Sequence, residues 1–129
     1  MGTAAEMGDF QVCLPCEPAS VPEAKVRVRE WCKSIGALRA VMSDVQLAIT
    51  EAASNAVRHS GGADFEVLGQ VTESSLIVSV WNRGQVDVHP GAGVGLEIMH
   101  GLAESVDFEN TRPGARVTMR FPRASAPIR

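Results

Sequence analysis

The order of apolar patterns along the chain predicts an α+β fold, a two-layer sandwich in which a mixed or antiparallel sheet is covered by helices on one face. A short strand pattern is followed by two adjacent segments with helical spacing, about 20–34 and 38–60. Two pairs of strand patterns follow, at 63–72 and 76–81 and then, after a helical segment at 94–103, at 105–108 and 115–121. The predicted domain occupies residues 9–122, with a loose leader, 1–8, and a polar tail, 123–129.

The first strand and the first helix have separate signatures. Apolar and polar residues alternate over 9–14, which predicts the strand. Ser20, followed three positions later by Glu23, predicts a capping box at the start of the 20–34 helix. Its apolar positions are Val21, Ala24, Val28, Trp31 and Cys32, and its basic positions are Lys25, Arg27, Arg29 and Lys33. The basic face is either a solvated surface or a docking surface for an acidic partner.

The helix predicted over 38–60 carries two sets of side chains at helical spacing. Its buried stripe is predicted to consist of Val45, Ile49, Ala52, Ala53 and Ala56. Glu51, Asn55 and His59 recur at every fourth residue, so they stack along one side of the helix. Such a row is either an ordinary solvated flank or a line of acid, amide and imidazole groups along a cleft.

The later strands differ in their expected burial. The segment 76–81 is almost entirely apolar and β-branched, which predicts a central strand buried on both faces. The strands at 105–108 and 115–121 are joined through a turn at 110–114, and this spacing predicts a hairpin with a longer loop.

Composition argues against several classes of function. The chain has 129 residues, 45% hydrophobic and 21% charged, which is ordinary for a globular protein. A net charge of -3 gives no case for nucleic-acid binding by phosphate neutralisation. No apolar run approaches the ~20 residues that span a bilayer, and the polar, acidic start does not resemble a signal peptide. The expected location is the cytoplasm.

Three cysteines invite a metal or redox interpretation. Cys13 and Cys16 form a Cys-Leu-Pro-Cys pair, and Cys32 stands alone. A pair with this spacing can be half of a zinc site or a redox pair. The second half of a zinc site is missing, and the prolines that follow, Pro18 and Pro22, do not suit a redox motif that opens a helix. Ordinary reduced thiols are expected.

Gly91, Gly93 and Gly95 precede or open the helix predicted at 94–103. Glycine lets backbone N–H groups approach an anion, and a helix N-terminus adds the positive end of its dipole. No Gly-Lys-Ser/Thr follows and no βαβ unit surrounds the segment, so it is neither a P-loop nor a Rossmann turn. The segment is a phosphate-binding loop or simply a flexible one.

These motifs occur in a specific order. Glu51-Ala-Ala-Ser-Asn55-Ala-Val-Arg58-His59 is followed by a strand that ends in Asn82-Arg83-Gly84, by the glycine-rich helix start, and by a final strand after Gly114. The order and spacing resemble the GHKL ATPases, which include histidine kinases and the ATP domains of DNA gyrase, Hsp90 and MutL. In its small size and in Glu51 the chain is most similar to anti-sigma factor serine kinases of the RsbW and SpoIIAB type. The resemblance covers about residues 9–122.

The resemblance implies the Bergerat (GHKL) ATP-binding fold, ATP and Mg²⁺ as cofactors, and a role for each matching residue. Glu51 would be the general base on a serine hydroxyl of the partner, Asn55 would hold Mg²⁺, and His59 would be a structural residue at the helix end. The implied nucleotide-binding residues are Asn55, Asn82, Gly84, Gly91, Gly93, Gly95 and Leu96. The implied partners are an anti-sigma factor antagonist of the STAS type, a sigma factor and a second copy in a homodimer. The basic face with Arg27 and Arg29 is a candidate docking surface.

The chain departs from the family on the adenine side of the pocket. Asn82 stands where the family turn Asp-x-Gly-x-Gly has the aspartate that accepts a hydrogen bond from the adenine amine. Val86 replaces the second glycine of that turn, and Ala115 replaces a threonine. An asparagine oxygen still accepts a hydrogen bond but lacks the charge that strengthens it. Two functions fit this pattern: an ATP-dependent serine kinase and anti-sigma factor, or a nucleotide-independent GHKL-fold regulator that acts by partner docking only.

Overall fold

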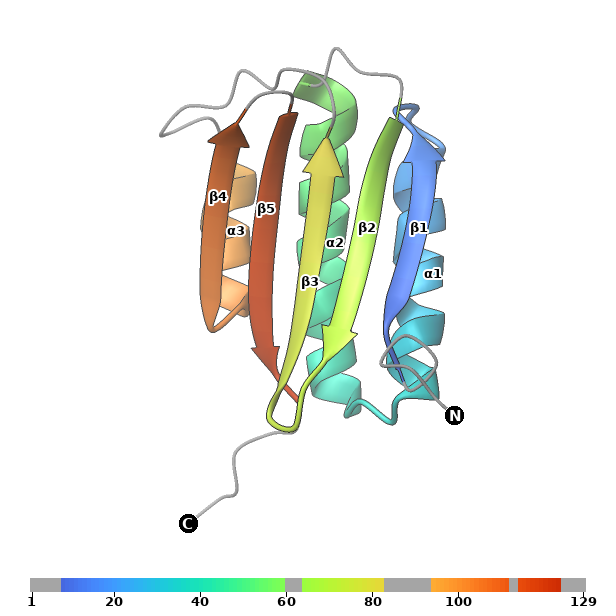
Figure 1. Ribbon diagram of the computed structural model, residues 1–129, viewed down its shortest axis with the longest axis vertical. Helices are drawn as coiled ribbons and strands as arrows, with labels where there is room; N and C mark the ends of the chain where they lie inside the picture. Colours follow the sequence, from blue (N-terminus) through green and yellow to red (C-terminus); the bar gives the residue numbers. More distant parts are fainter. Residues whose placement is uncertain (1–7, 60–63, 83–93, 112–113, 124–129) are drawn as a thin grey trace.

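The computed structural model describes residues 8–59, 64–82, 94–111 and 114–123. These residues form a five-stranded sheet in the order β1-β2-β3-β5-β4, and every strand pair is antiparallel. The helices lie behind the sheet in Figure 1 and cover one of its faces. The strands are β1 (Phe10–Pro15), β2 (Asp64–Val71), β3 (Ser75–Asn82), β4 (Ser105–Thr111) and β5 (Gly114–Pro122), and the helices are α1 (Ser20–Ser34), α2 (Arg39–His59) and α3 (Val94–Leu102). The predicted α+β sandwich is confirmed, with an antiparallel sheet.

The central helix, α2, contacts three strands of the sheet as well as α1 and α3. Its predicted buried stripe is confirmed, because all five side chains are at most 3% exposed: Val45, Ile49, Ala52, Ala53 and Ala56. Three of these residues are alanines, whose small side chains let the helix backbone approach the sheet closely while larger residues fill the space on either side. The largest fully buried side chains, Phe65 and Phe121, come from the sheet.

The central strand, β3, is not buried on both faces as predicted. Leu76, Val78 and Val80 are at most 2% exposed on the helix-covered face, whereas Ile77 and Trp81 on the opposite face are only half-buried. The prediction was wrong because an antiparallel sheet with helices on one side leaves its other face open. This open face still tolerates apolar side chains, since neighbouring strands shield them; the Arg116 guanidinium, for example, lies 5.7 Å from the ring centroid of Trp81.

The first helix starts differently from the prediction. Ser20 is not an N-cap but the first helical residue, and it is 5% exposed. Ala19 occupies the cap position with a helical backbone and makes no side-chain cap bond. The prediction of a capping box is therefore wrong. A preceding turn satisfies the first N–H groups of the helix instead. The backbone N–H of Ser20 donates to the carbonyl of Glu17 at 2.9 Å, and that of Val21 donates to the carbonyl of Pro18 at 3.2 Å.

The end of α1 is set by Gly36. Gly36 has a φ of +72°, which glycine adopts without steric cost. Its N–H donates to the carbonyl of Lys33 at 3.2 Å, and the N–H of Ala37 donates to the carbonyl of Cys32 at 2.9 Å. This pair of bonds is a Schellman motif, which satisfies carbonyls at the helix end and reverses the chain toward α2.

Trp31 fixes α1 against the edge of the sheet. Its ring stacks on Phe10 with centroids 5.7 Å apart, and its indole N–H donates to the carbonyl of Gly8. Gly69 on β2 lies directly beneath the ring, and a Cβ built there would be 2.9 Å from two of its carbon atoms. The glycine is therefore required by the close approach of the tryptophan.

The three cysteines form no disulfide. Cys13 on β1 is exposed, Cys16 is half-buried, and Cys32 is fully buried on the inner side of α1. Burial raises the pKa of the Cys32 thiol from 9.0 to about 11, which keeps it protonated at neutral pH. Within the described ranges, no helix is both long and apolar enough to cross a membrane.

Candidate functional site

Asn82, the last residue of β3, is the most unusual polar residue of the sheet. It is only 7% exposed and lies on the helix-covered face, between Phe65 of β2 and Ala115 of β5. Neither neighbour offers a side-chain donor. Its Oδ1 atom is fully buried and has no hydrogen-bond partner among the residues that the structure describes. An unpaired buried acceptor costs about 1–3 kcal/mol, so this position is suited to a ligand that brings a donor.

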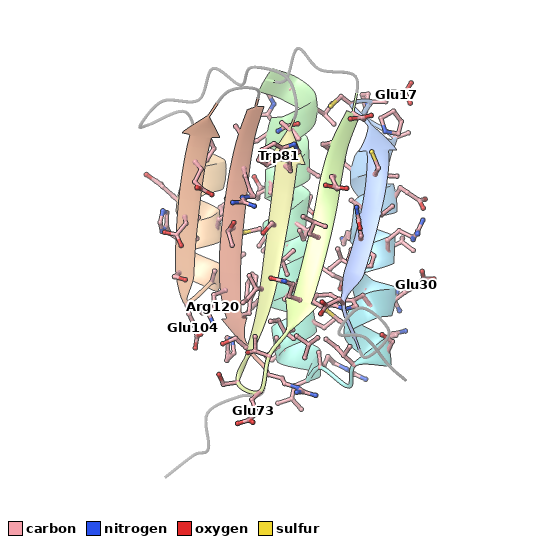
Figure 2. The ribbon with its side chains drawn as sticks, in the orientation of Figure 1. Glu17, Glu30, Glu73, Trp81, Glu104 and Arg120 are labelled. Carbon is pink, nitrogen blue, oxygen red and sulfur yellow. The ribbon has the colours of Figure 1, made fainter. Side chains whose placement is uncertain are left out.

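The elements that carry the other predicted site residues end at the same side of the sandwich. In Figure 1 the carboxyl ends of α2 and β3, the start of β5 and the amino end of α3 all point to the top of the view. Trp81, the neighbour of Asn82, marks this end in Figure 2. Segments far apart in sequence thus bring Asn55, Asn82 and Gly95 to one end of the fold.

The polar row on α2 lies at the border between the core and the surface. Glu51 and Asn55 are both half-buried, one helical turn apart, beside the fully buried Ala52 and Ala56. Both side chains therefore remain reachable while the helix that carries them is held rigidly by the core. His59 is the last residue of α2, and the surroundings of its side chain lie outside the described residues.

The predicted glycine site is described only in part. Gly95 and Leu96 lie in the first turn of α3, where backbone N–H groups have no partner within the helix and the dipole favours an anion. The surroundings of their side chains fall outside the described residues. The same is true of the whole segment with Gly84, Gly91 and Gly93, and of Val86.

The available metal ligands fit magnesium better than zinc. Among the described residues no group of three or more His, Cys, Asp or Glu side chains is close enough to hold a metal ion. Mg²⁺ does not need such a cage, because it keeps several waters and is often held by one or two protein oxygens together with substrate phosphates. The amide oxygen of Asn55, one turn from the carboxylate of Glu51, suits this kind of site.

A hollow that the sequence analysis did not anticipate lies on the open face of the sheet. It has a volume of about 340 Å³, and its lining includes Gln11, Leu68, Gln70, Ile77 and Arg116. These residues occupy alternate positions of their strands, so the strand alternation could have revealed the surface once the sheet was known to be covered on one face only. It is separated from Asn82 by the sheet itself.

Residues 14–121 match the family model of the histidine kinase-like ATPase domain. The chain belongs to this family. The match covers the three helices, β2, β3, β4, nearly all of β5 and the end of β1, and it agrees with the GHKL fold that the order of motifs predicted. No curated protein matches the sequence significantly.

Two solved structures share this fold. The RsbU and RsbW domains of a Mycobacterium tuberculosis protein superpose with a TM-score of 0.75 at 22% identity, over 88% of this chain and 32% of that one. The histidine kinase AdeS from Acinetobacter baumannii superposes with a TM-score of 0.56 at 13% identity, over 88% of this chain and 68% of that one. The chain therefore spans about a third of the length of the first protein. At these identities the likeness concerns the fold.

Proposed function

We propose that this histidine kinase-like ATPase domain is an ATP- and Mg²⁺-dependent serine kinase that phosphorylates a STAS-type anti-sigma factor antagonist and also binds a sigma factor. The observation that carries the proposal is the buried Oδ1 of Asn82, which has no partner in the described ranges and lies at the end of the sandwich where the polar row of α2 also ends. A buried acceptor without a partner is costly in a protein that binds nothing there. An exocyclic amine of a nucleotide base supplies the missing donor.

Each residue of this site has a distinct task in the proposed reaction. The carboxylate of Glu51 accepts the proton of the partner's serine hydroxyl as the oxygen attacks. The side-chain oxygen of Asn55 holds Mg²⁺, and Asn82 orients the base. Backbone N–H groups of Gly84, Gly91, Gly93, Gly95 and Leu96 hold the phosphates. Bound ATP would supply the γ-phosphoryl group to the serine oxygen, with ADP as the leaving group, and Mg²⁺ would neutralise charge on the phosphates.

The proposed protein partners dock on the exposed face of α1. Its four basic residues are all exposed there: Lys25, Arg27, Arg29 and Lys33. Arg27 lies 3.6 Å from Glu23, but both side chains are more than 40% exposed, so this pair is easily exchanged for a partner's carboxylate. Val26, which is 47% exposed, adds an apolar contact in the middle of the basic residues. The chain is proposed to act in the cytoplasm as a homodimer.

The kinase proposal is tested by Glu51→Gln in a phosphorylation assay with the cognate antagonist. The amide cannot accept the serine proton, so the rate should fall by at least about 10²-fold, the usual contribution of a general base. ATP affinity should change little, since Glu51 is assigned to the proton and not to the nucleotide. A mutant that phosphorylates at the wild-type rate would exclude Glu51 as the base.

A second candidate function is regulation by partner docking alone. It is favoured by the uncharged Asn82 and by its neighbour Ala115, which is 2% exposed and contributes no hydroxyl. The two functions predict different effects of ATP and Mg²⁺ on the melting temperature of the protein. Ligand at about 100 times its dissociation constant stabilises the folded state by about 2.7 kcal/mol, which is a shift of several degrees. An unchanged melting temperature at millimolar ATP favours the docking function.

A further inference from the structure

We infer that Asn82 makes the base pocket of this domain accept guanine as well as adenine nucleotides. The inference rests on the proposed nucleotide site and concerns its selectivity. It is carried by the side chain itself: a carboxamide at a position that is 93% buried, whose Oδ1 atom has no partner among the described residues. No hydrogen bond to Oδ1 from the described residues therefore fixes whether the oxygen or the nitrogen of the carboxamide faces inward.

The two residues paired with Asn82 on the neighbouring strands offer its carboxamide no side-chain hydrogen bond. Asn82 pairs with Phe65 of β2 on one side and with Ala115 of β5 on the other, and all three side chains lie on the helix-covered face. Phenylalanine and alanine side chains offer no polar group that would prefer oxygen to nitrogen. The two ends of an asparagine carboxamide have nearly the same shape, so a half-turn about its terminal torsion needs no repacking.

A carboxamide that can present either its oxygen or its N–H groups can hydrogen-bond either adenine or guanine. Adenine presents an amine donor at the position where guanine presents the carbonyl acceptor O6, and the two ring edges are otherwise of similar shape. A carboxylate only accepts hydrogen bonds, so it suits the adenine amine and faces O6 of guanine with a second acceptor. A carboxamide offers its oxygen to the amine of adenine or, after a half-turn, its N–H to O6 of guanine and its oxygen to the guanine N1–H.

The experiment is calorimetric titration of the full chain with ATP and, separately, with GTP, each with Mg²⁺. The expected ratio of the two dissociation constants is within about tenfold for the wild type. In Asn82→Asp the ratio should shift toward ATP by roughly 5- to 150-fold, the discrimination that one well-placed pair of base contacts provides. Gln70→Glu is the matched control, since it makes the same amide-to-acid change at an exposed position of β2 and should leave the ratio unchanged.

A second variant covers the case in which a buried carboxylate prevents Asn82→Asp from folding. Asn82→Ala removes both the acceptor and the donor of this side chain without burying a charge, so the affinities for ATP and GTP should fall together. A wild-type preference for ATP above about 100-fold overturns the inference and leaves the kinase proposal intact. An unchanged ratio in Asn82→Asp, or a loss of affinity for ATP alone in Asn82→Ala, also overturns it. If neither nucleotide binds the wild type at millimolar concentration, the proposed nucleotide site itself is wrong.

Discussion

On the open face of the sheet, polar side chains pair with one another across neighbouring strands, whereas on the covered face one polar atom of β3 has no partner within the described part of the chain. Gln11 donates to Glu66 between β1 and β2, Ser79 bonds Thr118 at 3.2 Å between β3 and β5, and Arg116 contacts Glu109 at 2.9 Å between β5 and β4. Asn82, the residue after Trp81, is buried, and its side-chain oxygen finds no hydrogen-bond donor among the residues that the structure describes.

The difference separates the stability of the fold from its proposed use. Polar pairs on a solvated face contribute little, because water competes for the same hydrogen bonds. A buried acceptor without a partner lowers stability by more than such a pair adds. Among the described residues, the sheet therefore keeps a buried polar atom without a partner where the proposed ligand would bind, whereas the open face carries polar pairs between neighbouring strands.

The sharpest contrast between the faces is expected from two adjacent residues of β3. Leu76 is fully buried beneath the helices, so Leu76→Ala should lower the free energy of unfolding by about 2–5 kcal/mol. Ile77 is half-buried on the open face, so Ile77→Ala should cost less than about 1.5 kcal/mol. Urea denaturation of both variants measures the difference. Equal losses would mean that the open face is covered by another surface in solution.

Close packing on the covered face is tested at Gly69. In Gly69→Ala the new Cβ would lie 2.9 Å from two carbons of the Trp31 ring, which is itself held by Phe10 and Gly8. The expected loss is about 1–3 kcal/mol, the usual cost of overpacking. Gly101→Ala is the control, because this helical glycine has nothing within 4 Å of its Cβ position and should stabilise α3 by ~0.5–1 kcal/mol. The two melting temperatures should move in opposite directions.

Removing the unpaired atom should stabilise the protein at the expense of ligand binding. Asn82→Leu replaces the carboxamide by an apolar group of similar size, so the free energy of unfolding should rise by about 1–3 kcal/mol. Nucleotide binding, measured by calorimetry, should be lost in the same variant. Gln70→Leu on the exposed side of β2 should change stability by no more than about 0.5 kcal/mol. A destabilised Asn82→Leu protein would show that the carboxamide is satisfied in solution.

Much of this arrangement was predictable from the sequence because it depends on local periodicity. The alternation of strands and the 3.6-residue spacing of α2 identified every element, and the alanine stripe identified the face that packs on the sheet. The capping of α1 was mispredicted because Ser20 and Glu23 have the composition of a capping box, while the preceding turn at Glu17 and Pro18 supplies the carbonyls instead. Composition cannot distinguish these two ways of satisfying the same N–H groups.

The burial of β3 was misjudged for a different reason. An apolar run such as 76–81 has the same composition whether its strand is covered on both faces or on one. On the open face of β3, side chains are shielded only by neighbouring strands, as Arg116 of β5 lies over Trp81. The candidate site was predictable as a set of residue types, including Asn82 as a departure from the related motif. The lack of a partner for the Asn82 oxygen among the described residues was not predictable, because it depends on the strand register that places Phe65 and Ala115 beside Asn82.

The smallest effect is expected from the ion pair of the open face. Arg116 and Glu109 are 41% and 53% exposed, so a double-mutant cycle with Arg116→Ala and Glu109→Ala should give a coupling energy of ~0.2–1 kcal/mol. The coupling should fall further in 1 M salt, where charges are screened within about 3 Å. Arg116→Ala alone should cost somewhat more than Glu109→Ala, because the guanidinium also lies over Trp81. A coupling above about 2 kcal/mol that resists salt would mean that this face is desolvated by a partner, and the contrast between the two faces of the sheet would then apply only to the isolated chain.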